Sequence, residues 1–425
     1  MKPNSNNVVA PQIQEPISLT STIQQPPPAS VPFPTNRCPF DPDPRYEGIR
    51  TSDPVLRVGT PAGFDVWLVS GYEDARTVLG DAETFSNVDA SSSHLMGDKD
   101  NLGAPPPPGV MLRHDGDSHS RLRLRLAREF MVKRIARLEP FIRDLVATHI
   151  DRIGQQKGPL DLYREFALPV PALVISEILG VPEGQRSEFE NATASQVDLS
   201  LPLEERQAAA IQSAGFFANL IQSKLENPGD DLLSRLILEP TERPMDAAEL
   251  QGIALLLLTA GHDTTANMIT LGTYALLQHP EQAAKLQNPA VMETGVDELI
   301  RYLTIVHNGV LRKAVKDTTI AGQTIRAGEH VAVVLESANR DNRFISDGDQ
   351  LDLERRSAHL GFGYGPHQCL GQHLARLELR IALPELFRRL PGMRVETPET
   401  DIPFKNDMLV YGIKKLMINW DEVIS

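Results

Sequence analysis

The feature that most limits the possible folds is a helical pattern that extends, with few interruptions, from Ser118 to about Leu390. Strand-like runs interrupt it at 310–325 and 331–335, and another precedes it at 64–69. The regular alternation of strands and helices that a doubly wound α/β fold requires is missing. No internal repeat or linker divides residues 38–425. We therefore expect one large, mainly α-helical domain with small β-sheets.

Two segments fall outside this pattern. Residues 1–37 are rich in Pro, Gln, Ser and Asn, which favours a disordered tail. Residues 86–109 form a long polar stretch that becomes Pro-rich at its end. A loop of this length inside a compact domain usually has a function.

Composition excludes several classes of protein. A net charge of -14 argues against a sequence-independent grip on nucleic acid. The longest apolar run, Ile253–Leu258, is far too short to span a bilayer, and no apolar leader is visible. Cys38 and Cys369 are the two cysteines, so a disulfide framework is excluded and a reducing compartment is indicated. We expect a cytoplasmic monomer without a membrane anchor.

Cys369 lies in an unusual segment, residues 362–371, which reads FGYGPHQCLG. Its glycines and proline cannot belong to a regular helix or strand, but they can form a tight turn against a flat group. A helical pattern follows at 372–387. A helix N-terminus and nearby backbone N–H groups would stabilise a thiolate at Cys369. On the residues alone, the alternative is a buried cysteine in a glycine-rich turn.

A second unusual segment reads AGHDTT, at residues 260–265, inside a helical pattern over 246–277. Gly, Asp and two Thr are poor choices for the middle of a helix. Threonine hydroxyls can bond to a carbonyl one turn earlier and bend the helix. Such a local violation indicates a functional site. The alternative is a bent core helix with a satisfied polar patch.

Residues 362–371 closely resemble the signature of the cytochrome P-450 superfamily, Phe-Gly-x-Gly-x-His/Arg-x-Cys-x-Gly. Every fixed position is matched, including those of Phe362, Gly363, His367, Cys369 and Gly371. The resemblance extends over residues 38–425 and implies the P-450 fold around a haem b. It also implies that Cys369 is the axial ligand of the haem iron, where a thiolate favours cleavage of the O–O bond.

In this superfamily, the segment at 260–265 resembles the distal helix over the iron. The resemblance implies that Ala260 and Gly261 lie at the haem and that a widened turn makes room for dioxygen. Thr264 would hydrogen bond during dioxygen activation. Asp263 would link bulk water to the site and deliver protons, as a general acid does.

The resemblance also implies which residues hold the haem propionates. They are His119, Arg123, Arg312 and His367. His119 and Arg123 are four residues apart and therefore share a helix face. The residues before them depart from the family pattern, since 115–117 reads Asp-Gly-Asp instead of Asp-Pro-Pro and Ser120 replaces a common Thr.

A structural ion pair is implied behind the cysteine turn. Glu298 and Arg301 are three residues apart on one helical face. An exposed pair of this kind contributes only tenths of a kcal/mol. In the family this pair packs with a later arginine, and the best match here is Arg340.

The implied reaction uses dioxygen, two electrons and two protons to convert R–H into R–OH and water. Because no nucleotide-binding segment is visible, the electrons would come from a ferredoxin and its ferredoxin reductase. A basic docking patch could be formed by Arg121, Arg125, Arg128, Arg376 and Arg380. The alternative is that these are scattered, solvated arginines.

Residues 166–171 and 301–306 resemble actinobacterial-type soluble members, most of which oxidise secondary metabolites, macrolides, steroids or xenobiotics. Substrate-contacting regions are implied at 86–112, 196–217, 255–264, 305–311 and 404–410. Several apolar residues there favour an apolar or amphipathic small molecule, which would be hydroxylated or epoxidised.

Two other functions remain open. Fungal nitric-oxide reductases of the same superfamily share the first of these stretches, but they lack the acidic residue of the distal motif. Asp263 therefore favours dioxygen activation. A non-catalytic haem-binding protein on the same fold would need no proton relay. His262 and His359 have no assigned role.

Overall fold

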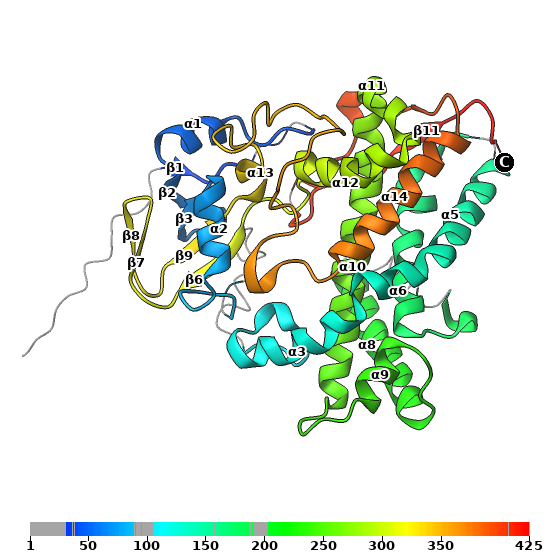
Figure 1. Cartoon of the computed structure of the whole chain (residues 1–425), viewed down its shortest axis with the longest axis horizontal. Coiled ribbons are helices and arrows are strands. Elements are labelled where there is room, and N and C mark those ends of the chain that lie inside the picture. Colours follow the sequence, from blue (N-terminus) through cyan, green and yellow to red (C-terminus); the bar gives the residue numbers. More distant parts are fainter. Residues whose placement is uncertain are drawn as a thin grey trace, which may run out of the picture.

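The computed structural model describes residues 31–424 except 36, 38, 89, 91–94, 96–104, 157, 187–188, 190–202 and 407. Most strands lie with α1 (Arg45–Ser52) and α2 (Tyr72–Gly80) on one side of the molecule (Figure 1). The long helices form the other side, and α10 (Ala247–Gln278) runs between the two parts (Figure 1). The expected mainly helical architecture with small sheets is confirmed.

The helical part is built around α10. This helix is buried on almost every side, as expected for a helix that is apolar all round. It begins after Asp246, whose carboxylate accepts a hydrogen bond from the Glu249 N–H at 2.8 Å, as an N-cap does. The other long helices are α3 (Gly116–Glu129), α5 (Glu139–Gly154), α6 (Pro169–Leu179), α8 (Leu203–Glu226), α12 (Pro289–Leu303) and α14 (Gln372–Arg389).

Short helices connect these long ones. They are α4 (Val132–Ile135), α9 (Leu232–Leu238), α11 (Pro280–Ala283), α13 (Leu335–Ala338) and a π-helical turn at Tyr163–Ala167. Both helices predicted beside the motifs are present, since α10 and α14 match the expected spans to within two residues. No helix in the described ranges is both long and apolar enough to cross a membrane.

The largest sheet has the strand order β1-β2-β3-β9-β6-β4. Its strands are β1 (Val31–Pro32), β2 (Val55–Gly59), β3 (Asp65–Val69), β4 (Phe85–Ser86), β6 (Val310–Ala314) and β9 (His330–Val333). β3 pairs in parallel with β9, with Trp67 opposite Val331. A second sheet joins β10 (Arg394–Val395), β11 (Met417–Asn419) and β5 (Leu160–Asp161), and β7 (Thr318–Ile320) pairs with β8 (Gln323–Ile325).

The predicted boundary between tail and domain at residue 38 is wrong. Val31 and Pro32 pair with β2, and Phe33 is buried in the core beneath it. Arg37 donates a hydrogen bond to the Thr304 carbonyl oxygen at 3.1 Å. A Pro-rich composition concealed these anchors, because one buried aromatic ring is enough to hold a short extended segment. Residues 1–30 lie outside the described part of the chain.

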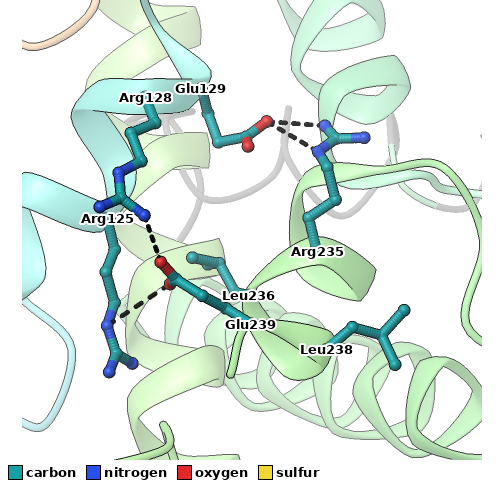
Figure 2. A pocket seen from close by; sticks show the side chains of 7 residues that line it. All are labelled: Arg125, Arg128, Glu129, Arg235, Leu236, Leu238 and Glu239. Atoms are coloured by element: carbon teal, nitrogen blue, oxygen red, sulfur yellow. Dashed lines mark hydrogen bonds and ion pairs between the residues drawn. The ribbon is translucent and has the colours of Figure 1, made fainter. Parts of the chain in front are cut away.

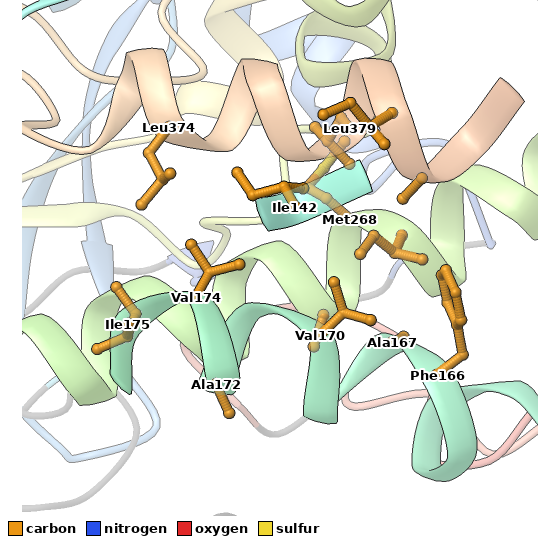
Figure 3. Packing of buried hydrophobic residues seen from close by; sticks show 14 of the residues in the cluster. Ile142, Phe166, Ala167, Val170, Ala172, Val174, Ile175, Met268, Leu374 and Leu379 are labelled. Atoms are coloured by element: carbon orange, nitrogen blue, oxygen red, sulfur yellow. The ribbon is translucent and has the colours of Figure 1, made fainter. Parts of the chain in front are cut away.

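The main core lies between α5, α6, α10 and α14 (Figure 3). Val170 and Ile175 of α6 lie between the ribbons in Figure 3, together with Met268 of α10 and Leu379 of α14. Gly261 permits this packing, because a Cβ atom there would lie 2.8 Å from Ile175 Cδ1. The segment that carries the distal motif is therefore held firmly by its neighbours.

A buried acid on α14 makes stability depend on pH. Glu378 is 1% exposed, its Oε2 has no hydrogen-bond partner among the described residues, and burial raises its pKa from 4.5 to about 8. Between these two values, the folded protein holds a proton that the unfolded chain has released. The contribution of Glu378 to the free energy of unfolding therefore falls as the pH rises from about 4.5 to 8.

We expect Glu378→Gln to remove this penalty. The melting temperature of the variant should exceed that of the wild type by more at pH 8 than at pH 5, as measured by circular dichroism. Glu281→Gln, at an exposed position on α11, is the matched control and should show no such difference. An equal effect of Glu378→Gln at both pH values would contradict the assignment.

Candidate active site

Cys369 lies at the end of the loop that leads into α14. Its N–H donates to the Phe362 carbonyl oxygen at 2.8 Å, and the Gly363 N–H donates to the Leu360 carbonyl oxygen at 2.7 Å. Gly363 and Gly365 have φ values of 70° and 73°, which glycine adopts readily. A Cβ atom at position 365 would lie 2.5 Å from the Leu79 carbonyl oxygen. The expected glycine turn is confirmed, and it packs against α2.

The surroundings of the Cys369 thiol favour its neutral form. The side chain is exposed, yet protein atoms surround the sulfur closely enough for burial to raise its pKa. Both observations hold if the sulfur lies on an inner surface. The predicted backbone donor is present, because the Gly371 N–H bonds to the sulfur and lowers the pKa of the thiol. The charges of Arg123 and Arg376 also act to lower this pKa. A bound cation would favour the thiolate, because metal ligation releases the thiol proton.

A polar network supports the cysteine loop from α12. Arg376 Nε donates to Asp297 at 2.8 Å, and its guanidinium lies 4.5 Å from the centre of the Phe362 ring. His359 Nε2 donates to the same carboxylate at 3.1 Å, while its Nδ1 accepts from the Gly361 N–H at 3.0 Å. His359, which had no predicted role, therefore ties the loop to α12.

The four residues predicted to hold propionates come together from three elements. His119 and Arg123 lie on α3, Arg312 lies on β6, and His367 lies in the cysteine loop. The rings of His119 and His367 are 4.1 Å apart. Burial lowers the pKa of both arginines, whereas the Asp115 charge raises the pKa of Arg312 and the Cys369 sulfur raises that of Arg123.

Several nitrogens of this group lack acceptors. His119 Nε2, His367 Nδ1 and Arg123 Nη1 are buried and have no hydrogen-bond partner within the described ranges. Burial lowers the pKa of His119 to about 4 and that of Arg312 to about 10. Leaving buried donors unpaired costs about 1–3 kcal/mol each. These residues therefore fit an anionic group with several acceptor oxygens, as the two propionates of haem are.

Asp115 belongs to this site, although no role for it was predicted from the sequence. Its carboxylate accepts hydrogen bonds from His367 Nε2 at 2.9 Å, Ser86 Oγ at 2.6 Å and the Asn87 N–H at 2.8 Å. Burial opposes ionisation, but these bonds together lower the pKa of Asp115 to about 2. Its position just before a helix that carries His119 was the signal that could have identified it.

The distal motif lies in the middle of α10. Thr264 Oγ1 donates to the Ala260 carbonyl oxygen at 2.7 Å, and Thr265 Oγ1 donates to that of Gly261 at 3.0 Å. This confirms the expected bonds to the preceding turn. The expected widened turn is not seen, because α10 continues through the motif without interruption. Ala260 is exposed, whereas the face of Gly261 is covered by Ile175 of α6.

Asp263 faces a buried polar cluster that the sequence did not indicate. Its Oδ1 accepts from Tyr163 Oη at 3.3 Å, Lys405 Nζ at 3.2 Å and Asn267 Nδ2 at 3.0 Å. Lys405 also lies 3.0 Å from Tyr163 Oη. His262 is buried next to Asp263, and its Nδ1 lies 3.0 Å from the Leu258 carbonyl oxygen. Only Asn267 is close enough in sequence to have been identified by helical spacing.

The predicted ion pair is present and fully buried, but its predicted third partner is wrong. Arg301 Nε donates to Glu298 Oε2 at 2.7 Å, and both side chains are 1% exposed. Arg355 Nε binds Glu298 Oε1 at 3.1 Å and completes the group. Arg340 instead lies over the Tyr302 ring and bonds to its carbonyl oxygen. The resemblance pointed to Arg340, and only the packed structure shows that Arg355 takes this place.

The predicted basic patch does not form as a free surface. Arg125 is 9% exposed, and together with Arg128 it faces Glu239 around a cavity of about 240 Å³ (Figure 2). Arg121 pairs with Glu249. Arg376 and Arg380 bond to Asp297 and to the Glu293 carbonyl oxygen, respectively. Each of the five arginines therefore has a partner within the molecule, although the Arg128 side chain remains 68% exposed.

Comparisons with known proteins agree with this site. The model of the family described as "Cytochrome P450" matches residues 161–420. The chain is 40% identical to cytochrome P450-SU2 of Streptomyces griseolus, over 95% of this chain and 100% of that protein. It is 41% identical to pentalenic acid synthase of Streptomyces avermitilis, over 92% and 98%.

Solved structures agree as well. The structure of cytochrome P450 MoxA from Nonomuraea recticatena has a TM-score of 0.85 and 41% identity, and covers 93% of this chain and 99% of that one. A complex of CYP105P1 with filipin I has a TM-score of 0.85 and 38% identity, and covers 93% and 100%. The family match and these identities show that the chain belongs to the cytochrome P450 family, and its cysteine loop, long central helix and haem-compatible site agree with this. The protein is therefore a haem-thiolate monooxygenase.

Proposed function

We propose that Cys369 ligates a haem b and that the enzyme hydroxylates or epoxidises an apolar or amphipathic secondary metabolite, with electrons from a ferredoxin and its reductase. The buried nitrogens of His119, Arg123 and His367 that have no hydrogen-bond partner in the described part of the chain carry this proposal. They fit the propionate edge of a haem, and His367 lies on the same loop as the thiol.

When bound, the haem supplies the reduction of dioxygen and the transfer of one oxygen atom. The chain's own groups hold and orient the reactants. The Cys369 thiolate holds the iron, while charge-assisted hydrogen bonds from His119, Arg123, Arg312 and His367 hold the propionates. Phe362 and Arg376 keep the loop in place.

Thr264 and Asp263 serve the proton supply. Thr264 donates its single hydroxyl hydrogen to the Ala260 carbonyl oxygen. The lone pairs of Thr264 Oγ1 are therefore free to accept a hydrogen bond from a water or a protonated group. Asp263, one residue earlier, is a carboxylate within reach of three donors and passes protons inward. An isolated gas-binding site would need neither group.

The substrate class is supported by the relatives. Pentalenic acid synthase and the filipin I complex of CYP105P1 point to bacterial natural products. The segments 305–311 and 404–410, where substrate contact is proposed, are joined by hydrogen bonds. The Tyr411 N–H donates to the Ile305 carbonyl oxygen at 2.7 Å, and the His307 N–H donates to that of Leu409 at 3.2 Å.

The deciding assay follows NADH oxidation with a surrogate ferredoxin and ferredoxin reductase over a panel of macrolides, terpenes and steroids. A product that has gained one oxygen atom supports the proposal. Consumption of nitric oxide without a substrate, and with no oxygenated product, would favour a nitric-oxide reductase. Haem-loaded protein that is inactive in both assays would indicate a non-catalytic haem protein.

Loss of a propionate contact should weaken haem retention. We expect Arg123→Leu to speed haem transfer to an excess of a haem scavenger by about ten- to a hundredfold, because a bond to a charged group contributes about 1.5–3 kcal/mol. Arg128→Leu on the same helix, where the side chain is mostly exposed, is the matched control. Equal transfer rates for both variants would show that Arg123 does not contact the haem.

For the ferredoxin we propose an apolar and basic face on α3 and α4. Leu124, Met131 and Val132 are 66%, 57% and 61% exposed, and Lys133 is exposed beside them. An exposed apolar patch edged by positive charge suits an acidic protein partner.

Leu124→Asp combined with Lys133→Glu should raise the KM for ferredoxin several-fold and flatten its dependence on salt, while substrate-induced spectral changes stay as in the wild type. Lys316→Glu, an exposed charge on the turn after β6, is the control. An unchanged KM in the double variant would place the docking face elsewhere.

A further inference from the structure

The acid of the distal motif is held by only one of its two oxygens. Tyr163, Lys405 and Asn267 all donate to Asp263 Oδ1. In the described part of the chain, no donor contacts Oδ2. The carboxylate is therefore anchored at one oxygen and leaves the other available to take up and release a proton.

The cation in this cluster comes from a β-hairpin at the C-terminal end of the chain. The Lys405 N–H donates to the Gly412 carbonyl oxygen at 2.9 Å, and the Lys414 N–H donates to that of Pro403 at 2.8 Å. Gly412 lies directly against α10, because a Cβ atom there would meet Asn267 Oδ1 at 2.0 Å. The hairpin and the acid are thus packed as one unit.

The same hairpin carries residues 404–410, where substrate contact is proposed. Its tip is bonded to the segment after α12, through Tyr411 to Ile305 and through an isolated bridge between Val306 and Val410. A displacement of this tip by a bound molecule would be transmitted along a short backbone segment to Lys405.

We propose that Lys405 and Tyr163 are positioning residues that hold Asp263 as an anchored carboxylate, and that Lys405 couples proton delivery to the substrate-side hairpin. This inference rests on the proposed function. Neither residue touches the reacting atoms; both act through Asp263.

The electrostatics of the cluster support this role. Lys405 is 5% exposed, and burial lowers its pKa, while the Asp263 charge raises it. Its ammonium also lies 4.5 Å from the centre of the Tyr163 ring. The other titratable groups that face the cluster are His262 on α10 and Lys414 on the hairpin. Removal of the Lys405 charge would leave the buried Asp263 carboxylate without its cation, which is unfavourable in a buried site.

The test compares Lys405→Met with Lys415→Met, an exposed lysine next to the same hairpin. The measurement is NADH oxidation by the holoenzyme with a surrogate ferredoxin system across pH, in H2O and in D2O. For Lys405→Met we expect the acid limb of the profile to move up by about 1–3 pH units, since an opposite charge at this distance has an effect of that size. The solvent isotope effect should also rise.

Lys415→Met should leave both quantities as in the wild type, and Lys405→Arg should restore them in part. An unmoved acid limb and isotope effect in Lys405→Met would overturn the inference. If Lys405→Met does not load haem, Tyr163→Phe takes its place, because it removes one donor and keeps the ring. An unmoved isotope effect in that variant would then overturn the inference.

A second readout does not depend on turnover. Thermal unfolding of Lys405→Met, Asp263→Asn and the double variant should be non-additive, because the second substitution removes a partner that is already lost. Additive shifts would show that the two groups do not interact. A wild-type enzyme that oxidises no NADH would contradict the proposed function, whereas an active wild type with additive shifts contradicts only this inference.

Discussion

Cys369→Ser is expected to abolish the red-shifted Soret band of the reduced, carbon-monoxide-bound protein and to lower monooxygenase turnover by more than about 100-fold. Loss of a residue that merely supports a metal ligand costs about 10–100-fold, so loss of the ligand itself must cost more. Serine keeps the size of the side chain and the acceptor for the Gly371 N–H, so the turn should remain folded. Absorption spectroscopy and product analysis measure the two effects.

Cys38→Ser changes the only other cysteine of the sequence and is the matched control. It should keep both the spectrum and the activity. A thiolate spectrum that persists in Cys369→Ser would assign the ligand to another residue. Loss of the spectrum from wild-type, haem-loaded and folded protein would refute the haem-thiolate assignment altogether.

Arg301→Met is expected to destabilise the fold by about 3–5 kcal/mol, because it leaves the buried Glu298 carboxylate without its main partner. The guanidinium also donates to the carbonyl oxygens of Asn339 at 2.9 Å and Gly348 at 2.7 Å. These bonds join α12 to the segments that precede the cysteine loop. Urea unfolding should show the loss as a lower midpoint, accompanied by poorer incorporation of haem.

The control is an ion pair of the same type at the surface. Arg143 donates to Glu139 at 2.7 Å, and both side chains are largely exposed, so Arg143→Ala should cost no more than about 0.5 kcal/mol. A comparable, small loss in both variants would mean that the buried pair is not a structural support. The contrast tests burial, because both are Glu–Arg pairs within one helix and their spacing differs by only one residue.

Most of the local structure could be predicted from the sequence. Helical periodicity and poor helix formers identified α10 and its distal motif, and the run of glycines before α14 identified the cysteine turn. The tail boundary was misjudged, because Pro-rich composition outweighed the single buried ring of Phe33. The expected widened turn in α10 came from family resemblance and is absent from the hydrogen-bond pattern.

Contacts between distant residues could not be predicted. Tyr163 and Lys405 are 100 and 142 residues from Asp263, and nothing in their neighbourhood indicates that they converge on it. The sequence pointed to Arg340 as the third partner of Glu298, and only the folded loop after α13 shows that Arg355 takes this place. Arg125 has the same sequence environment as an exposed arginine, yet packing buries it against Glu239.

The sequence alone determined the position of Cys369 in a glycine turn before a helix, because dihedral preferences and helical periodicity act over a few residues. The tertiary structure alone decided the surroundings of the thiol and of the acid. The Cys369 pKa is raised by burial, and Asp263 is anchored by residues from other elements. Burial and charge act through space, so they depend on which distant segments the fold brings together.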